Sequence, residues 1–184
     1  MKGIIRIERT GTGLVVVDIQ ERLLPSIFEQ EKLIQTCLRL LKGAEILGIP
    51  IFATEQYRKG LGATSPEIAG AIKGFAPLEK VTFSACGAEG FLDNLKAKSI
   101  KNVILCGMES HICVLQTCLD LLEHNLGVFV VADAISARNA ENSRLALQRM
   151  HDAGAVIAST EMVLFELLGR ARTEEFKQVQ ALVK

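Results

Sequence analysis

Residues 102–122 read NVILCGMESHICVLQTCLDLL, and this stretch carries the strongest fold signal in the chain. Its first part, 102–107, is a short apolar run that predicts a strand buried on both faces. The part that follows predicts a helix over 111–125, because apolar residues recur there at helical spacing. Those residues are Leu115, Cys118, Leu119 and Leu122. The stretch therefore predicts one strand–helix unit of a parallel sheet.

The same alternation repeats along the whole chain. Further apolar runs predict strands at 14–18, 49–54, 77–83, 126–133 and 155–159. Helical patterns cover 31–48, 89–98, 139–153 and 173–182, and a segment that Ser159 caps and Gly169 ends. Between them, 55–68 predicts a long loop and 68–72 a short helical turn. We expect a single α/β domain over 1–184, with a doubly wound parallel sheet covered by helices on both faces.

The composition argues against several classes of protein. Lysine plus arginine equals aspartate plus glutamate, at 21 each, and the chain has no tryptophan, so no nucleic-acid partner is expected. No apolar run reaches about 18 residues, so no membrane span is expected. The N-terminal stretch MKGIIRIERTGTG has charges among its apolar residues and does not resemble a signal peptide. Five cysteines without a CxxC pair favour a reducing cytoplasm over a disulfide framework or a zinc ribbon.

Three side chains lie at predicted strand ends, where doubly wound sheets place their binding and catalytic residues. Asp18 ends the first strand, although an aspartate there could simply cap the next helix. Lys80 lies in the third strand, where a solvated edge lysine is the alternative. Cys113 follows the fourth strand. His111 lies two residues from Cys113 and cannot share its helical face, so no histidine fills the role of base.

Cys113 differs from the other four cysteines by its position in the first turn of a helix. Free N–H groups and the helix dipole there are expected to lower the pKa of the thiol, unless it is a small buried hydrophobe. Cys37 and Cys118 lie on apolar helix faces, and Cys106 lies inside a strand. Cys86, in a predicted loop or helix start, remains a weaker candidate for the reactive cysteine. A carboxylate, an ammonium group and a thiol are the parts that acyl transfer needs.

Three motifs in this order resemble the isochorismatase-like cysteine hydrolases, which include nicotinamidases and carbamoylsarcosine amidohydrolases. They are VVVDIQ with Asp18, EKVTFSAC with Lys80 and LCGMESHICVLQT with Cys113. Other stretches, such as VVADAISARNAENSRLALQRM, resemble the branch of isochorismatase-domain proteins whose substrates are mostly unknown. The resemblance implies a three-layer α/β/α sandwich with a six-stranded parallel sheet in the order 3-2-1-4-5-6. That order would bring Asp18 and Cys113 together.

The resemblance also implies a mechanism. Asp18 would take the proton of Cys113, Lys80 would hold Asp18, and the sulfur would attack a carbonyl carbon. The backbone N–H groups of Glu109 and Cys113 would form the oxyanion hole. The peptide before Glu109 is often cis in this family, so Met108–Glu109 is expected to be cis.

Departures from the family pattern limit which of the family's activities are expected for this chain. Metal-dependent nicotinamidases carry an aspartate and two histidines after the second strand, where this chain reads ATEQYRKGLG, so neither a metal nor a cofactor is expected. Because Cys113 is retained, C–N hydrolysis of a small amide, ureide or carbamate is favoured. The expected pocket residues, which could equally be ordinary loop or core residues, are Gln20, Thr54, Gln56 and Phe83.

Two other hypotheses stay open: a silent binding or scaffold protein that has kept the three residues, and a redox-sensing thiol protein. The family usually forms dimers, tetramers or larger rings, so a homo-oligomer is expected. Val163, Leu164 and Leu167 are candidates for packing between its subunits.

Overall fold

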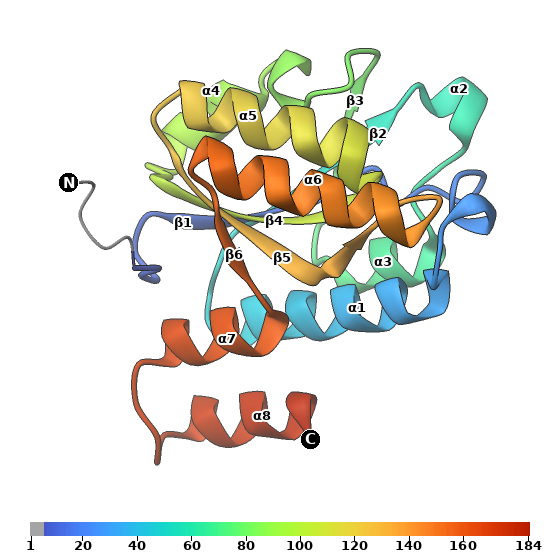
Figure 1. Ribbon diagram of the computed structural model, residues 1–184. Coiled ribbons are helices and arrows are strands. Elements are labelled where there is room, and N and C mark those ends of the chain that lie inside the picture. The colour runs from blue at the N-terminus through green and yellow to red at the C-terminus, as the bar shows by residue number, and fades with distance from the viewer. Residues whose placement is uncertain (1–5) are drawn as a thin grey trace.

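The computed structural model describes residues 6–184 and contains a six-stranded sheet in the order β3-β2-β1-β4-β5-β6. Each neighbouring pair is parallel, as the alternation of strands and helices predicts (Figure 1). The strands are β1 (Thr12–Val17), β2 (Ile51–Gln56), β3 (Leu78–Lys80), β4 (Asn102–Met108), β5 (Gly127–Ser136) and β6 (Val156–Ala158). The expected sandwich and its strand order are confirmed. Residues 1–5 of the segment examined for a signal peptide lie outside the described residues.

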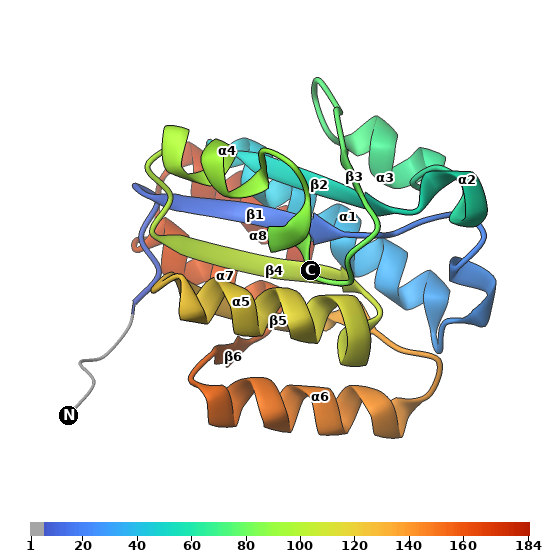
Figure 2. The ribbon, with the colours of Figure 1, turned by 90° about the horizontal axis from the view of Figure 1, so that it is seen from above.

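Helices cover both faces of the sheet (Figures 1 and 2). One layer holds α1 (Gln30–Ile46), α3 (Pro66–Ala71), α7 (Thr160–Leu168) and α8 (Glu174–Val183). The other layer holds α4 (Phe91–Ala97), α5 (Leu115–Glu123) and α6 (Ala140–Ala153). A separate apolar core fills each interface between helices and sheet. No helix within 6–184 is long and apolar enough to cross a membrane.

Several boundaries differ from the sequence prediction. The predicted loop at 55–68 begins inside β2 and contains the short helix α2 (Arg58–Leu61) and the start of α3. The predicted strand at 77–83 keeps only β3, whereas β5 continues to Ser136, three residues past its expected end. The helix expected at 111–125 starts as a π-helical turn, η3 (Ser110–Val114), before α5. Short edge strands and π-helical turns at helix starts depend on tertiary contacts that periodicity does not record.

The segment after β6 follows its predicted capping. The Ser159 hydroxyl accepts a hydrogen bond from the N–H of Met162, and Gly169 ends α7 with a φ of 67°. The expectation that Val163, Leu164 and Leu167 pack between subunits is wrong. Their exposed fractions are 1%, 0% and 5%, because α7 turns them into the core of its own chain against α1 and β5.

The two central strands approach each other closely at Gly107. Val17 and Gly107 are partners in the β1–β4 pairing, and Gly107 has a φ of 119°. A Cβ atom at this position would lie 2.1 Å from the carbonyl oxygen of Val17. Only glycine fits this backbone conformation and this spacing. The close approach brings the residues that follow β1 and β4 to one end of the sheet, at the switch point between strands.

Candidate active site

Asp18 directly follows β1 and is fully buried, with a φ of 51°. Its Oδ1 accepts a hydrogen bond of 2.7 Å from the Thr54 hydroxyl, and its Oδ2 lies 2.6 Å from the Lys80 ammonium. Burial raises the pKa of the Asp18 carboxyl, while Lys80 and the hydrogen bond from Thr54 oppose the rise. The alternative of a helix cap is therefore replaced by a buried ion pair.

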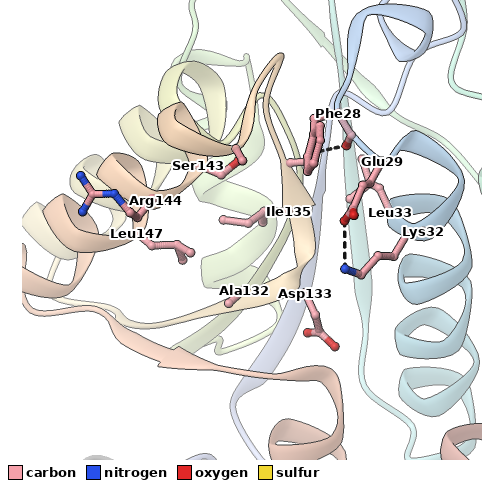
Figure 3. Close-up of a pocket in the computed structure, with 12 residues that line it drawn as sticks. Phe28, Glu29, Lys32, Leu33, Ala132, Asp133, Ile135, Ser143, Arg144 and Leu147 are labelled. Atoms are coloured by element: carbon pink, nitrogen blue, oxygen red, sulfur yellow. Dashed lines mark hydrogen bonds and ion pairs between the residues drawn. The ribbon is translucent and has the colours of Figure 1, made fainter.

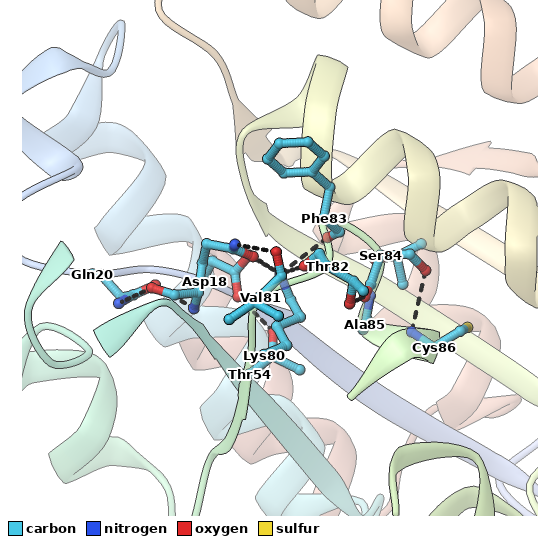
Figure 4. A network of polar contacts seen from close by, with 12 residues as sticks. Asp18, Gln20, Thr54, Lys80, Val81, Thr82, Phe83, Ser84, Ala85 and Cys86 are labelled. Atoms are coloured by element: carbon cyan, nitrogen blue, oxygen red, sulfur yellow. Dashed lines mark hydrogen bonds and ion pairs between the residues drawn. The ribbon is translucent and has the colours of Figure 1, made fainter. Parts of the chain in front are cut away.

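Lys80 is the last residue of β3, and its ammonium group is enclosed (Figure 4). Besides Asp18, Nζ donates to Gln56 Oε1 at 2.7 Å and to the backbone oxygens of Thr82 at 3.2 Å and Phe83 at 3.0 Å. The alternative of a solvated edge lysine is wrong, because the chain after β3 wraps back over the side chain. Four oxygen acceptors around one ammonium compensate for the loss of water.

Cys113 lies in the π-helical turn η3, with an exposed fraction of 5%. Asp18 and Lys80 are charged neighbours of its thiol. The expected lowering of its pKa is wrong: burial, followed by the charge of Asp18, raises the pKa of the Cys113 thiol to about 12, against an opposing effect of Lys80. Desolvation and a neighbouring carboxylate both favour the protonated thiol. The resting site therefore holds a thiol beside a carboxylate.

The other cysteines lack such partners for catalysis. Cys37, Cys106 and Cys118 are fully buried in the two cores, as expected. Cys86 lies in the short 3₁₀ turn Ala85–Gly87 and is only partly exposed, and burial raises its pKa to about 11. Among the described cysteines, Cys113 is the one whose thiol meets both Asp18 and Lys80 as charged neighbours.

The corner between β4 and η3 carries the expected cis peptide, Met108–Glu109. The backbone oxygen of Glu109 accepts hydrogen bonds from the N–H groups of Ile112 and Val114, both at 3.1 Å. These two bonds fix the corner that leads into Cys113. The N–H groups of Glu109 and Cys113 are the oxyanion donors that the resemblance implied, and this role stays a prediction.

The four expected pocket residues differ in exposure. Gln20 and Thr54 are buried, and Gln20 binds the backbone of Gln56 through both ends of its amide and the oxygen of Gly62. Gln56 touches Lys80 and also donates to Val81. Phe83 is about half exposed and points away from the polar network (Figure 4). A role in substrate contact stays a prediction for all four. Gln20 and Thr54, the two buried residues, hold the backbone of Gln56 and the carboxylate of Asp18 in place.

Comparison with known proteins identifies the family. The isochorismatase domain model matches residues 12–162. This chain belongs to the isochorismatase family. Zebrafish isochorismatase domain-containing protein 2 is 39% identical over 184 residues, covering 100% of this chain and 92% of its own length.

Solved structures similar to this chain have the same fold. The structure described as MAR1 ribonuclease from Caenorhabditis elegans is 40% identical, has a TM-score of 0.91, and covers 97% of this chain and 92% of its own. The YcaC product of Escherichia coli, described as an octameric hydrolase of unknown specificity, is 25% identical with a TM-score of 0.92, covering 99% and 92%. The two structures thus show that the α/β architecture is shared.

Two contacts of the segment 109–114, which contains Cys113, were missed by reasoning from the sequence. Arg138, two residues past the end of β5, donates from Nε to Glu109 Oε1 at 2.7 Å. The Ser110 hydroxyl lies 3.0 Å from that of Ser143 on α6, which ties η3 to this helix. Inspection of every strand end would have found Arg138, since β5 neighbours β4. His111 turns its Nε2 toward Asn142 at 3.4 Å, which agrees with its exclusion as the base.

A separate cavity of about 300 Å³ lies between α1, β5 and α6 (Figure 3). Its walls are largely apolar, with Phe28, Leu33, Ile135 and Leu147 among them. It contains neither Asp18 nor Cys113. Its charged residues are Glu29, Lys32, Asp133 and Arg144, of which Glu29 and Lys32 form an ion pair with each other. This cavity is distinct from the Cys113 site. Within 6–184, no group of three or more histidine, cysteine or acidic side chains could hold a metal ion.

Proposed function

We propose that this chain is a cysteine hydrolase that cleaves a C–N bond of a small amide, ureide or carbamate through a thioester on Cys113. The observation that carries the proposal is a buried ion pair of 2.6 Å between Asp18 and Lys80, both of which are charged neighbours of the Cys113 thiol. A buried ion pair adds little stability relative to apolar residues of similar size, so its presence here favours a chemical role.

The first step is proton transfer from the thiol to Asp18. A thiol with a pKa of about 12 is protonated at neutral pH, so the sulfur needs a base as it attacks the carbonyl carbon. Burial raises the pKa of Asp18, which makes its carboxylate a better proton acceptor. The positive charge of Lys80 opposes that rise and so favours the ionised form of Asp18.

Attack of the sulfur breaks the C=O π bond and gives a tetrahedral oxyanion, which the N–H groups of Glu109 and Cys113 would stabilise. Asp18 then returns the proton to the leaving nitrogen as the C–N bond breaks, and an amine departs. Water attacks the thioester with Asp18 as base and releases a carboxylic or carbamic acid, while the proton restores the thiol. These steps balance without a cofactor or metal.

The experiment is a hydrolysis panel of small amides, ureides and carbamates, with Cys113→Ser and Asp18→Asn as inactive controls. Acyl-enzyme trapping on Cys113, read by mass spectrometry, would support the thioester. Turnover that survives in Cys113→Ser would sink the mechanism. Binding of a panel member without turnover or adduct would favour the silent binding protein instead.

Two alternative functions, a redox sensor and a ribonuclease, are tested alongside the hydrolysis panel. A reversible sulfenic acid on Cys113 under mild peroxide, together with no turnover, would favour a redox sensor. Because the nematode relative is described as a ribonuclease, RNA belongs in the panel as well. RNA cleavage that needs Cys113 would replace the small-molecule proposal.

We also propose that the chain assembles with copies of itself. The Escherichia coli relative is described as octameric, and this chain exposes large apolar side chains such as Met162 and Phe165 on α7. Light scattering tests the proposal, and a monomer at micromolar concentration would refute it.

A further inference from the structure

An ion pair flanks the corner that leads into Cys113. Glu109 Oε1 accepts a hydrogen bond of 2.7 Å from Arg138 Nε. The exposed fraction of the Glu109 side chain is 10%, whereas that of Arg138 is 56%. A carboxylate that has lost most of its water requires a partner, and this arginine is the partner that the described residues supply. The bond joins the β5–α6 connection to the end of β4.

The pair differs from the other arginine–glutamate pair near α6. Arg144 and Glu141 are both 63% exposed and lie one helical turn apart on a solvated surface. Such pairs contribute little, because water screens both charges. Glu109 instead has its backbone bound inside η3 and its carboxylate mostly buried, so the position of its charge is fixed relative to Cys113.

Glu109 stands at the start of the turn that contains Cys113, four residues before it in the chain. The charged groups that influence Cys113 are Asp18, Lys80 and Glu109, and the charge of Glu109 raises the pKa of the thiol. His111 shares the same turn and faces Asn142. Negative charge on the sulfur is therefore opposed by a neighbouring carboxylate, unless a cation compensates it.

We propose that Arg138 is a positioning residue of the cysteine site, which holds and neutralises the Glu109 carboxylate so that negative charge can develop on the Cys113 sulfur. Moving a proton from the thiol to Asp18 shifts one negative charge from the carboxylate to the sulfur, where the charge of Glu109 opposes it. Arg138 offsets the charge of Glu109, and without Arg138 this opposition is not compensated. The inference rests on the proposed function, because it explains how the nucleophile forms.

The test measures the rate of iodoacetamide alkylation, mapped to individual cysteines by mass spectrometry at pH 8.5. Arg138→Gln is expected to slow alkylation of Cys113 about three- to tenfold, which corresponds to a rise of roughly half to one unit in its pKa. Arg138→Lys restores the charge and is expected to recover most of the rate. Cys86 serves as an internal control whose rate is unchanged.

Two further variants separate this charge effect from a loss of structure. Arg144→Gln breaks the exposed pair on α6 and is the matched control, with no effect on Cys113 expected. Glu109→Gln removes the carboxylate, so adding Arg138→Gln in that background should change the rate less than twofold. Equal slowing by Arg138→Gln in both backgrounds would overturn the inference, as would an unchanged rate in the single variant.

The outcomes also distinguish the two proposals. An effect of Arg138→Gln on the thiol in a protein without turnover would reject the proposed hydrolase and keep the inference. Turnover with an Arg138→Gln variant that matches the wild type in both alkylation and hydrolysis would reject the inference alone. A wild-type Cys113 that iodoacetamide never labels, while Cys86 reacts, would count against both.

Discussion

Replacing Lys80 by methionine tests the buried ion pair most directly. Methionine fills a similar volume, but it removes the cation that lies 2.6 Å from Asp18. The carboxylate keeps its hydrogen bond of 2.7 Å from the Thr54 hydroxyl, and it remains fully buried. Removing one partner of a buried pair typically costs about 3–5 kcal/mol. Lys80→Met is therefore expected to lower the free energy of unfolding by about that amount at pH 7.

The stability lost in Lys80→Met should depend on pH, and the pKa of Asp18 sets the direction of that dependence. Its pKa already lies above the ordinary value of 3.8, and Lys80 acts to lower it, so Lys80→Met raises it further. A carboxyl whose folded pKa is raised contributes stability below its unfolded pKa and loses it as pH rises through the folded pKa. The deficit of Lys80→Met should therefore be smaller near pH 4–5 than at pH 8, by about 1.4 kcal/mol for each unit of added shift.

The assay is urea unfolding at pH 4.5, 6 and 8 for four proteins: wild type, Lys80→Met, Asp18→Asn and the double variant. In Lys80→Met the backbone oxygens of Thr82 and Phe83 also lose their hydrogen-bond donor. This lowers the free energy of unfolding by an amount that does not vary with pH. The double variant should recover about 2 kcal/mol or more relative to the sum of the singles. Additive losses that stay constant across pH would refute the reasoning.

Three other changes test separate features. Gln20→Ala removes the buried amide that binds the backbone at two places, and urea unfolding should show a loss of about 2–4 kcal/mol; a loss below 1 kcal/mol would contradict this. Gly107→Ala should fail to yield folded protein by circular dichroism, because the new Cβ would meet the Val17 oxygen at 2.1 Å, whereas Gly70→Ala, which meets nothing within 4 Å, should be neutral or stabilising. Alkylation of Cys113 should rise about tenfold per pH unit from pH 7 to 10, because its thiol pKa is about 12, and a plateau near pH 8 would contradict that value.

The fold could be predicted from the sequence because its signal is local and repeated. Runs such as LVVVD at 14–18 and NVILC at 102–106 are long enough to identify buried parallel strands, and the helices between them show clear periodicity. Strand order required the family resemblance, and the sheet confirms it. The prediction failed where the sequence signal is short. Lys80 ends a strand of three residues, and the π-helical start at Ser110 has no periodic signature.

The failed prediction for α7 has a different cause. Val163, Leu164 and Leu167 are apolar at helical spacing, and that pattern shows that a face is buried without saying against what. A core of the same chain and a subunit interface exclude water equally well, so the pattern is the same for both. The structure places this face against α1 and β5.

By itself the sequence determined the residue types of the candidate site and their places at three strand ends. It could do so because local hydrophobic patterns predict the alternation of parallel strands and helices. Only the tertiary structure decided their electrostatic state. A helix-start position predicts an acidic thiol, yet burial beside Asp18 raises the pKa of Cys113 to about 12. Contacts between distant segments also produced the four-acceptor shell of Lys80 and the Glu109–Arg138 pair. Desolvation depends on everything packed around a group, and no local pattern records it.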